Sequence, residues 1–397
     1  MNEFTKRREK ILEQMPAKTV AILHSGDQKQ SSRDQNFPFS PNRNFLYLTG
    51  LEIPRCILML HKKAEDKTEE FLFIERPDDH SVLYFGEMKE ADYYEQETGI
   101  ETCDYIDRFD FTLRRVLARF STEVVYLDID HYGNGYAQKL ADSLRGDLPF
   151  LQFKNIAPAI ARLRRIKTAD EIANIRRAIE LTALGIESIR ENIKPGIMEY
   201  QLEAHFDFAL RYNGAHGTAF DTIMASGINS CTLHYEDNNC KLEKGDVLLI
   251  DLGAQYNYYC ADISRTFPVD GKFSDKQQYF YDAVLETQKY LIENCLRPGF
   301  VHENTWTETN KYLSKFLIKA GLIQSESEIK KYLPHGICHF LGLDAHDAGE
   351  FGLLEPGMVI TCEPGVYLPE YGFGIRIEDD ILITENGCEN LSAVIAK

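Results

Sequence analysis

Residues 335–363 read HGICHFLGLDAHDAGEFGLLEPGMVITCE and gather three histidines and an acid among short runs bounded by glycine. An earlier stretch, residues 233–253, reads LHYEDNNCKLEKGDVLLIDLG and has the same skeleton. In both stretches an interval of 17 positions separates a histidine from an acid: His234 from Asp251, and His346 from Glu363. The sequence therefore contains one unit twice, and each copy directs a histidine and an acid towards a common place.

Two helices are expected before each of these stretches. Thr168 and Glu171 form a capping-box pattern, and isoleucines at spacings of three and four follow it along one helical face as far as Lys194-Pro195-Gly196. A second helix is expected over residues 198–212. The plan recurs with a helix over residues 275–295 and another that ends near residue 320, and Arg297-Pro298-Gly299 lies 103 positions after the first terminator. A helix-helix-strand unit used twice predicts a domain with pseudo-two-fold symmetry, a shared sheet and a central cleft.

The length of 397 residues exceeds the usual size of one hydrophobic core, so two domains are expected. Residues 1–155 alternate between helix-like and strand-like segments, and apolar strands are expected at residues 19–24, 56–61, 71–75 and 124–130. We therefore predict an N-terminal α/β domain over residues 1–155 and a C-terminal domain over residues 156–397. A basic segment, RLRRIK, leads into the second domain, and the whole chain is predicted to be α+β.

Composition excludes several classes of protein. The 44 basic and 62 acidic residues leave a net charge of −18, which disfavours nucleic acid as a partner. The nine cysteines contain no C-x-x-C pair and are odd in number, as expected of reduced thiols in the cytoplasm. The first residues, MNEFTKRREKILEQM, are charged throughout, and no run of 18 apolar residues follows, so neither a signal peptide nor a membrane span is expected.

Four acids lie inside apolar strands. Asp251 follows VLLI, and a turn-prone Gly-Ala-Gln-Tyr-Asn segment should fold it into a hairpin with Asp262. A buried carboxylate without a counter-charge costs several kcal/mol or takes up a proton, so a metal ion or an arginine is needed. A structural ion pair with Arg265 is one reading of this hairpin.

The second stretch supplies the other two acids. Glu363 follows MVITC, and Glu378 lies in GIRIEDDILI, where alternation places Arg376 on the same face. Four such acids are too many for one arginine to neutralise. With His339 they have the composition of a two-metal site, for which Mn²⁺ is the natural candidate and Zn²⁺ or Co²⁺ are alternatives. Cys338 and Cys362 are then expected to be small core residues.

The settings of these five residues, IDLG, ADISRTF, HGICHFLGLDAHD, CEPG and RIEDD, resemble the ligand motifs of the metallopeptidase family with the pita-bread fold, M24B. Aminopeptidase P, prolidase and methionine aminopeptidase belong to it. The motif NRNFLYLTG makes the N-terminal domain similar to the creatinase/aminopeptidase P type. The resemblance implies five metal ligands: Asp251, Asp262, His339, Glu363 and Glu378. One motif departs, because Tyr84-Phe85-Gly86 stands where relatives often have W-x-G.

The resemblance also implies roles in catalysis. Glu363 would accept a proton from a water held by two metal ions and pass it to the leaving nitrogen. His234 and His346 would line the site and contact the scissile carbonyl and the residue after the cut, with His335 nearby; which histidine polarises the carbonyl stays open. Arg376 would orient the acids. Tyr367 either hydrogen-bonds near the metals or only packs.

The activity implied is that of an Xaa-Pro aminopeptidase, which removes an N-terminal residue that precedes proline. An Xaa-Pro dipeptidase, or prolidase, shares the fold and every ligand and is the alternative. The fold also serves as a metal-free binding module, but such modules lose ligands and this chain has all five. Proline-containing peptides are the expected partners, and a homodimer or homotetramer is the expected assembly.

Overall fold

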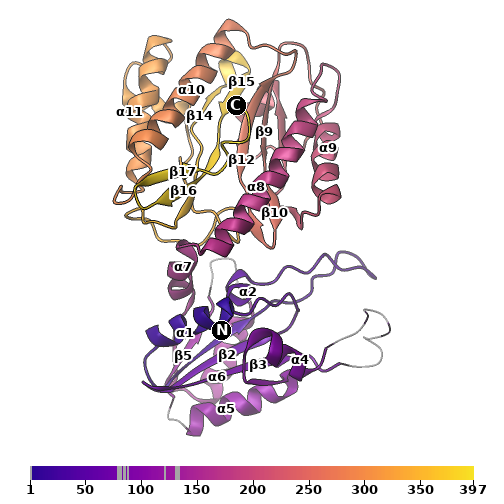
Figure 1. Cartoon of the computed structure of the whole chain (residues 1–397), viewed down its shortest axis with the longest axis vertical. Coiled ribbons are helices and arrows are strands. Elements are labelled where there is room, and N and C mark those ends of the chain that lie inside the picture. Colours follow the sequence, from indigo (N-terminus) through magenta and orange to yellow (C-terminus); the bar gives the residue numbers. More distant parts are fainter. Residues whose placement is uncertain (1, 78–82, 84–85, 87–88, 120–121, 130–134) are drawn as a thin grey trace. The chain divides into compact units, whose positions relative to one another are not determined.

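The computed structural model describes residues 2–77, 83, 86, 89–119, 122–129 and 135–397 (Figure 1). Tyr84 and Phe85 of the departing motif lie outside these residues. The chain divides into two compact units, Met1–Leu163 and Arg164–Lys397. The division falls within helix α7 (Ala157–Arg165), eight residues after the end of the predicted N-terminal domain. Within the described ranges, no helix has the length and apolar character needed to cross a membrane.

The first unit is built on a mixed six-stranded sheet in the order β4-β3-β2-β1-β5-β6. The pairs β1–β2 and β2–β3 are antiparallel, and the pairs β1–β5, β5–β6 and β3–β4 are parallel. Apolar side chains of α5 and α6 pack with those of the sheet into one core. The predicted α/β character is confirmed. The strands and helices of this unit are β1 Thr19–His24, β2 Ile57–Ala64, β3 Lys67–Ile74, β4 Thr102–Tyr105, β5 Val124–Leu127, β6 Gln152–Asn155, α1 Glu3–Gln14, α2 Arg43–Thr49, α4 Ala91–Thr98, η1 Ile106–Arg108, α5 Phe109–Arg119 and α6 Gly135–Asp147.

The second unit contains two pairs of helices with the strands between them (Figure 1). The helices α8 and α9 pack on β7, β8, β10 and β11, and α10 packs on β13, β14 and β15. The capping box of Thr168 and Glu171 begins α8 as predicted. The elements of this unit are α8 Ala169–Arg190, α9 Glu199–Tyr212, β7 Gly217–Thr218, β8 Ile223–Ser226, η2 Gly227–Cys231, β9 Val247–Leu252, β10 Ala254–Tyr256, β11 Tyr259–Cys260, β12 Ile263–Pro268, α10 Asp275–Asn294, α11 Asn304–Lys319, η3 Glu326–Lys331, β13 Val359–Cys362, β14 Gly365–Leu368, η4 Pro369–Tyr371, β15 Phe373–Arg376, β16 Asp379–Thr384 and β17 Gly387–Asn390.

The predicted duplication appears in the backbone hydrogen bonds where each second helix begins. In the first half, Gly196 N–H donates to the carbonyl of Leu242, and Glu199 N–H donates to that of Cys240, at 2.8 and 2.9 Å. In the second half the same pattern recurs at 2.9 and 2.8 Å: Gly299 donates to Leu354, and His302 donates to Gly352. Glu199 and His302 are therefore equivalent positions, and the pseudo-two-fold repeat is confirmed.

The strands of the two halves form separate ladders rather than the single shared sheet that was predicted. The order is β12-β9-β8 in the first half and β13-β16-β17 in the second, with two smaller ladders beside them. The halves are joined locally, because Glu378 N–H donates to the carbonyl of Ser264 at 3.0 Å. This junction brings the starts of β12 and β16 side by side.

The hairpin that carries Asp251 and Asp262 closes around Gly253. A Cβ at this position would lie 1.7 Å from the carbonyl oxygen of Ala261, which is backbone and cannot rotate away. We predict that Gly253→Ala lowers the free energy of unfolding by about 3 kcal/mol or more, because overpacking against backbone forces the strands apart. Thermal unfolding and metal content measure the effect. Gly217→Ala is the matched control, because its Cβ would meet no atom within 4 Å. Equal stability of the two variants would contradict the prediction.

Candidate metal centre

The four predicted acids lie at equivalent ends of two hairpins. Asp251 is in β9 and pairs with Ser264 of β12, so Asp262 lies just beyond the start of the same pair of strands. In the second half, Cys362 of β13 pairs with Asp379 of β16, which places Glu363 and Glu378 at the corresponding end. The duplication therefore brings one carboxylate pair from each half to a single place.

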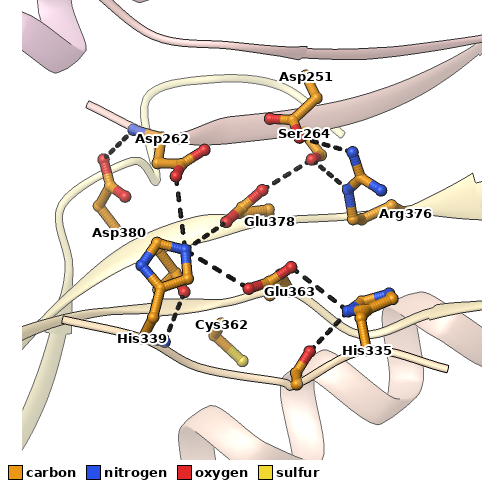
Figure 2. A network of polar contacts seen from close by, with 12 residues as sticks. Asp251, Asp262, Ser264, His335, His339, Cys362, Glu363, Arg376, Glu378 and Asp380 are labelled. Carbon is orange, nitrogen blue, oxygen red and sulfur yellow. Dashed lines mark hydrogen bonds and ion pairs between the residues drawn. The ribbon is translucent and has the colours of Figure 1, made fainter. Parts of the chain in front are cut away.

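His339 lies at the centre of this group (Figure 2). Its Nε2 is 3.5 Å from Oδ2 of Asp262, 3.5 Å from Oε1 of Glu363 and 3.9 Å from Oε1 of Glu378. Its Nδ1 is 3.1 Å from the carbonyl of Phe340. A carbonyl only accepts, so Nδ1 carries the proton and Nε2 presents a lone pair to the acids, as a metal ligand must.

The ligand atoms form overlapping groups with separations of at most 4.8 Å. One group is Asp251, Asp262 and Glu378, and another is His339, Glu363 and Glu378. Because Glu378 belongs to both, its carboxylate lies where it could bridge two ions. A third group joins His346 to Asp262 and His339. His346 was not among the predicted ligands, but its side chain lies close enough to those of Asp262 and His339 to hold an ion together with them.

The electrostatics of the acids fit a cation site. Burial and the carboxylate of Asp251 raise the pKa of Asp262 well above its usual value, and burial and Asp262 do the same to Glu378. Burial raises the pKa of the Glu363 carboxyl to about 8, against the opposing charge of Arg376. Oδ1 of Asp251 is buried and has no hydrogen-bond partner among the described residues. An orphaned carboxylate oxygen beside acids that repel one another is what a divalent ion would satisfy.

One arginine holds the acids from the other side. Arg376 donates from Nη2 to Oδ2 of Asp251 at 2.6 Å and from Nε to Oγ of Ser264 at 2.7 Å. Ser264 in turn donates to Oε2 of Glu378 at 2.7 Å. Arg376 therefore fixes one acid of each half, one directly and one through a hydroxyl.

The reading that Arg265 pairs with Asp251 is wrong. Arg265 is fully buried and donates to Oδ1 of Asp379 at 2.8 Å and to the carbonyl of Glu378 at 2.6 Å. Asp251 lies directly across from Ser264, so Arg265, the next residue along β12, points to the opposite face of the two strands. The counter-charge of Asp251 comes from the other half of the repeat instead.

Tyr367, whose role the sequence left open, takes part in a hydrogen-bond chain. Its hydroxyl accepts from Nη1 of Arg376 at 2.9 Å and therefore donates to Nε2 of His335 at 2.8 Å. His335 then carries its proton on Nδ1, which lies 2.6 Å from the carbonyl of Gly336 and 3.5 Å from Oε2 of Glu363. Burial and the charge of Arg376 lower the pKa of His335 to about 4, so this ring is neutral at pH 7.

The two histidines matched by the 17-residue interval are solvent-exposed and face the other histidines. The ring centroid of His346 is 4.0 Å from that of His339. His234 lies close enough to lower the pKa of both His335 and His346, after the larger effect of burial. His234, His335 and His346 are therefore gathered beside the acids.

Sequence reasoning missed three residues at the site. Ser264 and Asp380 each lie two positions after a predicted acid, Asp262 and Glu378 respectively. Because side chains alternate along a strand, this spacing places each on the same face as its acid and could have identified it. Asp380 accepts from the N–H of Asp262 at 3.2 Å through Oδ2. Asp347, next to His346, is held at 2.5 Å by Arg164 and at 3.1 Å by Lys167, both from the RLRRIK segment. The expectation that Cys338 and Cys362 are core residues is confirmed by their burial.

Comparison with known proteins gives two family matches. The model of metallopeptidase family M24 matches residues 173–385, and that of the aminopeptidase P N-terminal domain matches residues 4–126. The Xaa-Pro aminopeptidase of Escherichia coli K12 is 34% identical over 100% of this chain and 95% of its own. A solved Bacillus anthracis protein assigned to aminopeptidase P has a TM-score of 0.95 at 40% identity, covering 99% of this chain and 95% of that one. Zn-substituted E. coli aminopeptidase P in complex with product has a TM-score of 0.92 at 33% identity, covering 100% and 95%.

The pKa shifts predict how the stability of the metal-free protein depends on pH. Between pH 6.5 and 8 the folded state keeps a proton on Glu363 that the unfolded state, with a pKa near 4.5, has lost. Stability therefore falls as pH rises through this window, by a few kcal/mol. The lowered pKa values of His335 and His339 act in the opposite direction, but only below their usual value of 6.5.

Thermal unfolding of metal-free protein at pH 6.5 and 8, with and without MnCl₂, measures this dependence. The ion should raise Tm more at pH 8, because it binds ionised carboxylates. Glu363→Gln, which has no titrating group there, should flatten the slope without metal. A metal-free Tm that rises from pH 6.5 to 8 would show that the acids are not coupled as described.

Proposed function

The chain belongs to metallopeptidase family M24, and on that premise we propose that it is an Xaa-Pro aminopeptidase with a dinuclear manganese centre. It is a metallo-aminopeptidase that acts on peptides and uses divalent metal. The observation that carries the proposal is the pair of ligand groups that share Glu378, beside a buried oxygen of Asp251 that has no hydrogen-bond partner in the described part of the chain. Oxygen donors with one imidazole suit Mn²⁺, and Zn²⁺ or Co²⁺ would also fit.

Five residues would hold the ions: Asp251, Asp262, His339, Glu363 and Glu378. When bound, two divalent ions supply Lewis acidity and a water molecule of lowered pKa as the nucleophile. Thiolate ligands are not required by this set, in agreement with buried Cys338 and Cys362.

Glu363 is the residue we assign to proton transfer. Its carboxylate lies among the proposed ligands, with Oε1 3.5 Å from Nε2 of His339, so a water molecule held by the ions would be within its reach. It would accept a proton from the attacking water and pass it to the leaving proline nitrogen. His335 lies beside it, with Nδ1 3.5 Å from Oε2 of Glu363 and 2.6 Å from the carbonyl of Gly336, to which the Nδ1–H donates.

The exposed histidines would bind the peptide. His234 and His346 are free of regular secondary structure and face the acids, so their N–H groups are available to the scissile carbonyl and to the residue after the cut. Arg376 and Tyr367 would orient the acids and His335 through the hydrogen bonds described above. An Xaa-Pro bond lacks an N–H, so recognition cannot depend on that donor.

The domain organisation proposed is an aminopeptidase P-type domain at residues 1–155 and a catalytic domain at residues 156–397. The two family matches and the two compact units support it. Nine unpaired cysteines and a net charge of −18 support a cytoplasmic location. A homodimer or homotetramer is proposed as the assembly.

Substrate length separates the proposed activity from that of a prolidase, which would use the same ligands. We predict that protein reconstituted with Mn²⁺ releases glycine from Gly-Pro-Xaa tripeptides and cleaves the dipeptide Gly-Pro at least about tenfold more slowly, a difference of about 1.4 kcal/mol in transition-state binding. Chelation should abolish both reactions. Chromatography of the released amino acids measures the rates. Cleavage of the dipeptide alone would establish the prolidase alternative, and substoichiometric metal with no cleavage would favour a binding module.

Substitution of Glu363 tests the proton transfer. Glu363→Gln keeps the shape of the side chain and removes its basicity, so kcat should fall by about 10²–10⁴-fold. Metal stoichiometry is measured in parallel, because Glu363 is also a proposed ligand. Glu389→Gln is the control, since that acid pairs with Arg176 at the surface of β17. A fully metallated Glu363→Gln variant with kcat within threefold of wild type would remove Glu363 from this role.

A further inference from the structure

Glu199, the first residue of α9, is a buried carboxylate surrounded by neutral hydrogen-bond donors. Its exposure is 0%. Oε1 accepts from the N–H and hydroxyl of Ser226, at 2.8 and 2.7 Å, and from Nδ2 of Asn229 at 3.2 Å. Oε2 accepts from the hydroxyl of Tyr235 and the N–H of Cys240, each at 2.8 Å. All five donors lie between residues 226 and 240.

A buried carboxylate depends on such bonds, because moving a charge out of water without partners is costly. Hydrogen bonds to an ionised acceptor are also roughly twice as strong as those between neutral groups. The five bonds therefore hold residues 226–240 firmly against the start of α9. Losing any one of them leaves either a buried donor or the carboxylate less satisfied.

This segment carries His234 and has little structure of its own. After η2 ends at Cys231, residues 232–240 form no helix or strand. The Glu199 bonds fix Tyr235, directly after His234, and Cys240, at the end of the segment. Asn238 is fixed separately, by donating to the carbonyl of Thr222 at 2.7 Å and accepting from the N–H of Met224 at 2.9 Å. The backbone on the C-terminal side of His234 is thus held by side chains, with one backbone bond at its end, from the Glu199 N–H to the carbonyl of Cys240 at 2.9 Å.

The second half of the repeat supports this reading independently. His302 occupies the position equivalent to Glu199 and is 5% exposed, and its ring stacks on that of Phe340 with the ring centroids 5.7 Å apart. Phe340 directly follows His339. In both halves, this position near the start of the second helix is therefore a buried polar side chain that contacts a neighbour of a site histidine.

We propose that Glu199 is a positioning residue, which sets the location of His234 through Tyr235 and Cys240. The proposal rests on the function proposed above, in which His234 contacts the peptide. Within the residues that the structure describes, the hydrogen bonds accepted by the Glu199 carboxylate all come from residues 226–240, so its effect on the reaction would pass through the segment that it holds.

Glu199→Gln tests the proposal with little change in shape. The amide nitrogen that replaces one carboxylate oxygen cannot accept from an N–H, so at least one of the five donors loses its partner. We expect faster amide hydrogen exchange in residues 226–240 and a fall of kcat/KM for Gly-Pro-Xaa by about 10- to 100-fold at unchanged metal content. In the double variant with His234→Ala, kcat/KM should equal that of His234→Ala alone.

Glu308→Gln is the matched control. Glu308 on α11 accepts from the hydroxyl of Tyr290 at 2.6 Å, so this variant also removes a carboxylate from a tyrosine, at a distance from the histidine segment. It should leave exchange in residues 226–240 and kcat/KM unchanged. Tyr235→Phe removes only one donor, so it should change hydrogen exchange in residues 226–240 and kcat/KM in the same direction as Glu199→Gln, but by less. If Glu199→Gln fails to fold, Tyr235→Phe tests the proposal in its place.

Two results would overturn the proposal. Unchanged exchange in residues 226–240 in both variants would show that Glu199 does not hold the segment, and losses that multiply in the double variant would show that it does not act through His234. If the wild-type protein cleaves no Xaa-Pro peptide, the proposed function fails first. The exchange measurement would still report whether the carboxylate holds the segment.

Discussion

The mutual repulsion of four carboxylates, two buried and two half-buried, is the constraint around which the catalytic unit is built. Burial raises the pKa values of Asp262, Glu363 and Glu378, and the charge of Asp251 raises each of them further. A single guanidinium, that of Arg376, cannot neutralise four acids, and it reaches only Asp251 and, through Ser264, Glu378. Such a cluster is tolerable only if cations complete it or protons are taken up. This repulsion destabilises the metal-free protein. Because divalent ions relieve it, the same free energy contributes to their binding affinity.

Duplication explains how the cluster is assembled from a chain in which its members are far apart. Each half presents one carboxylate at the end of a strand and one at the start of the strand paired with it. The halves meet where Glu378 N–H bonds to the carbonyl of Ser264. The first hairpin closes tightly, with Gly253 against the carbonyl of Ala261, whereas a Cβ on the corresponding Gly365 would lie 3.1 Å from the carbonyl oxygen of Ile375. The position of the acids therefore depends on how the backbone closes at the end of each hairpin.

Much of this arrangement could be read from sequence, because the repeat keeps acids at fixed intervals and strands alternate. The duplication and the placement of four acids in apolar strands follow from such patterns, whereas the assignment of five ligands rests on the resemblance to the family motifs. Other features depend on which elements meet in space. Arg265 was a plausible partner of Asp251 by proximity, yet strand alternation sends it to Asp379. The motif NRNFLYLTG, used in the sequence analysis only for its family resemblance, forms helix α2, because Asn42 caps it and Gly50 adopts a left-handed conformation at its end. The role of Glu199 was invisible, because its five donors lie 27 to 41 positions away.

The two halves are equivalent in backbone but not in ligand chemistry, and the difference lies in one residue. Ala225 pairs with Leu249 in the first half, and in the second His339 accepts through its carbonyl from the N–H of Thr361, which is 112 positions after Leu249. Ala225 is thus the counterpart of His339. The two residues are 114 positions apart, so an alignment of the two halves at a constant interval of 112 would not match them. The group of Asp251, Asp262 and Glu378 offers only oxygen, whereas that of His339, Glu363 and Glu378 adds a nitrogen. Because imidazole suits borderline ions and carboxylates suit hard ones, the two groups would differ in the metal they favour under the proposed dinuclear centre, and Mn²⁺ is an ion that both sets could accept.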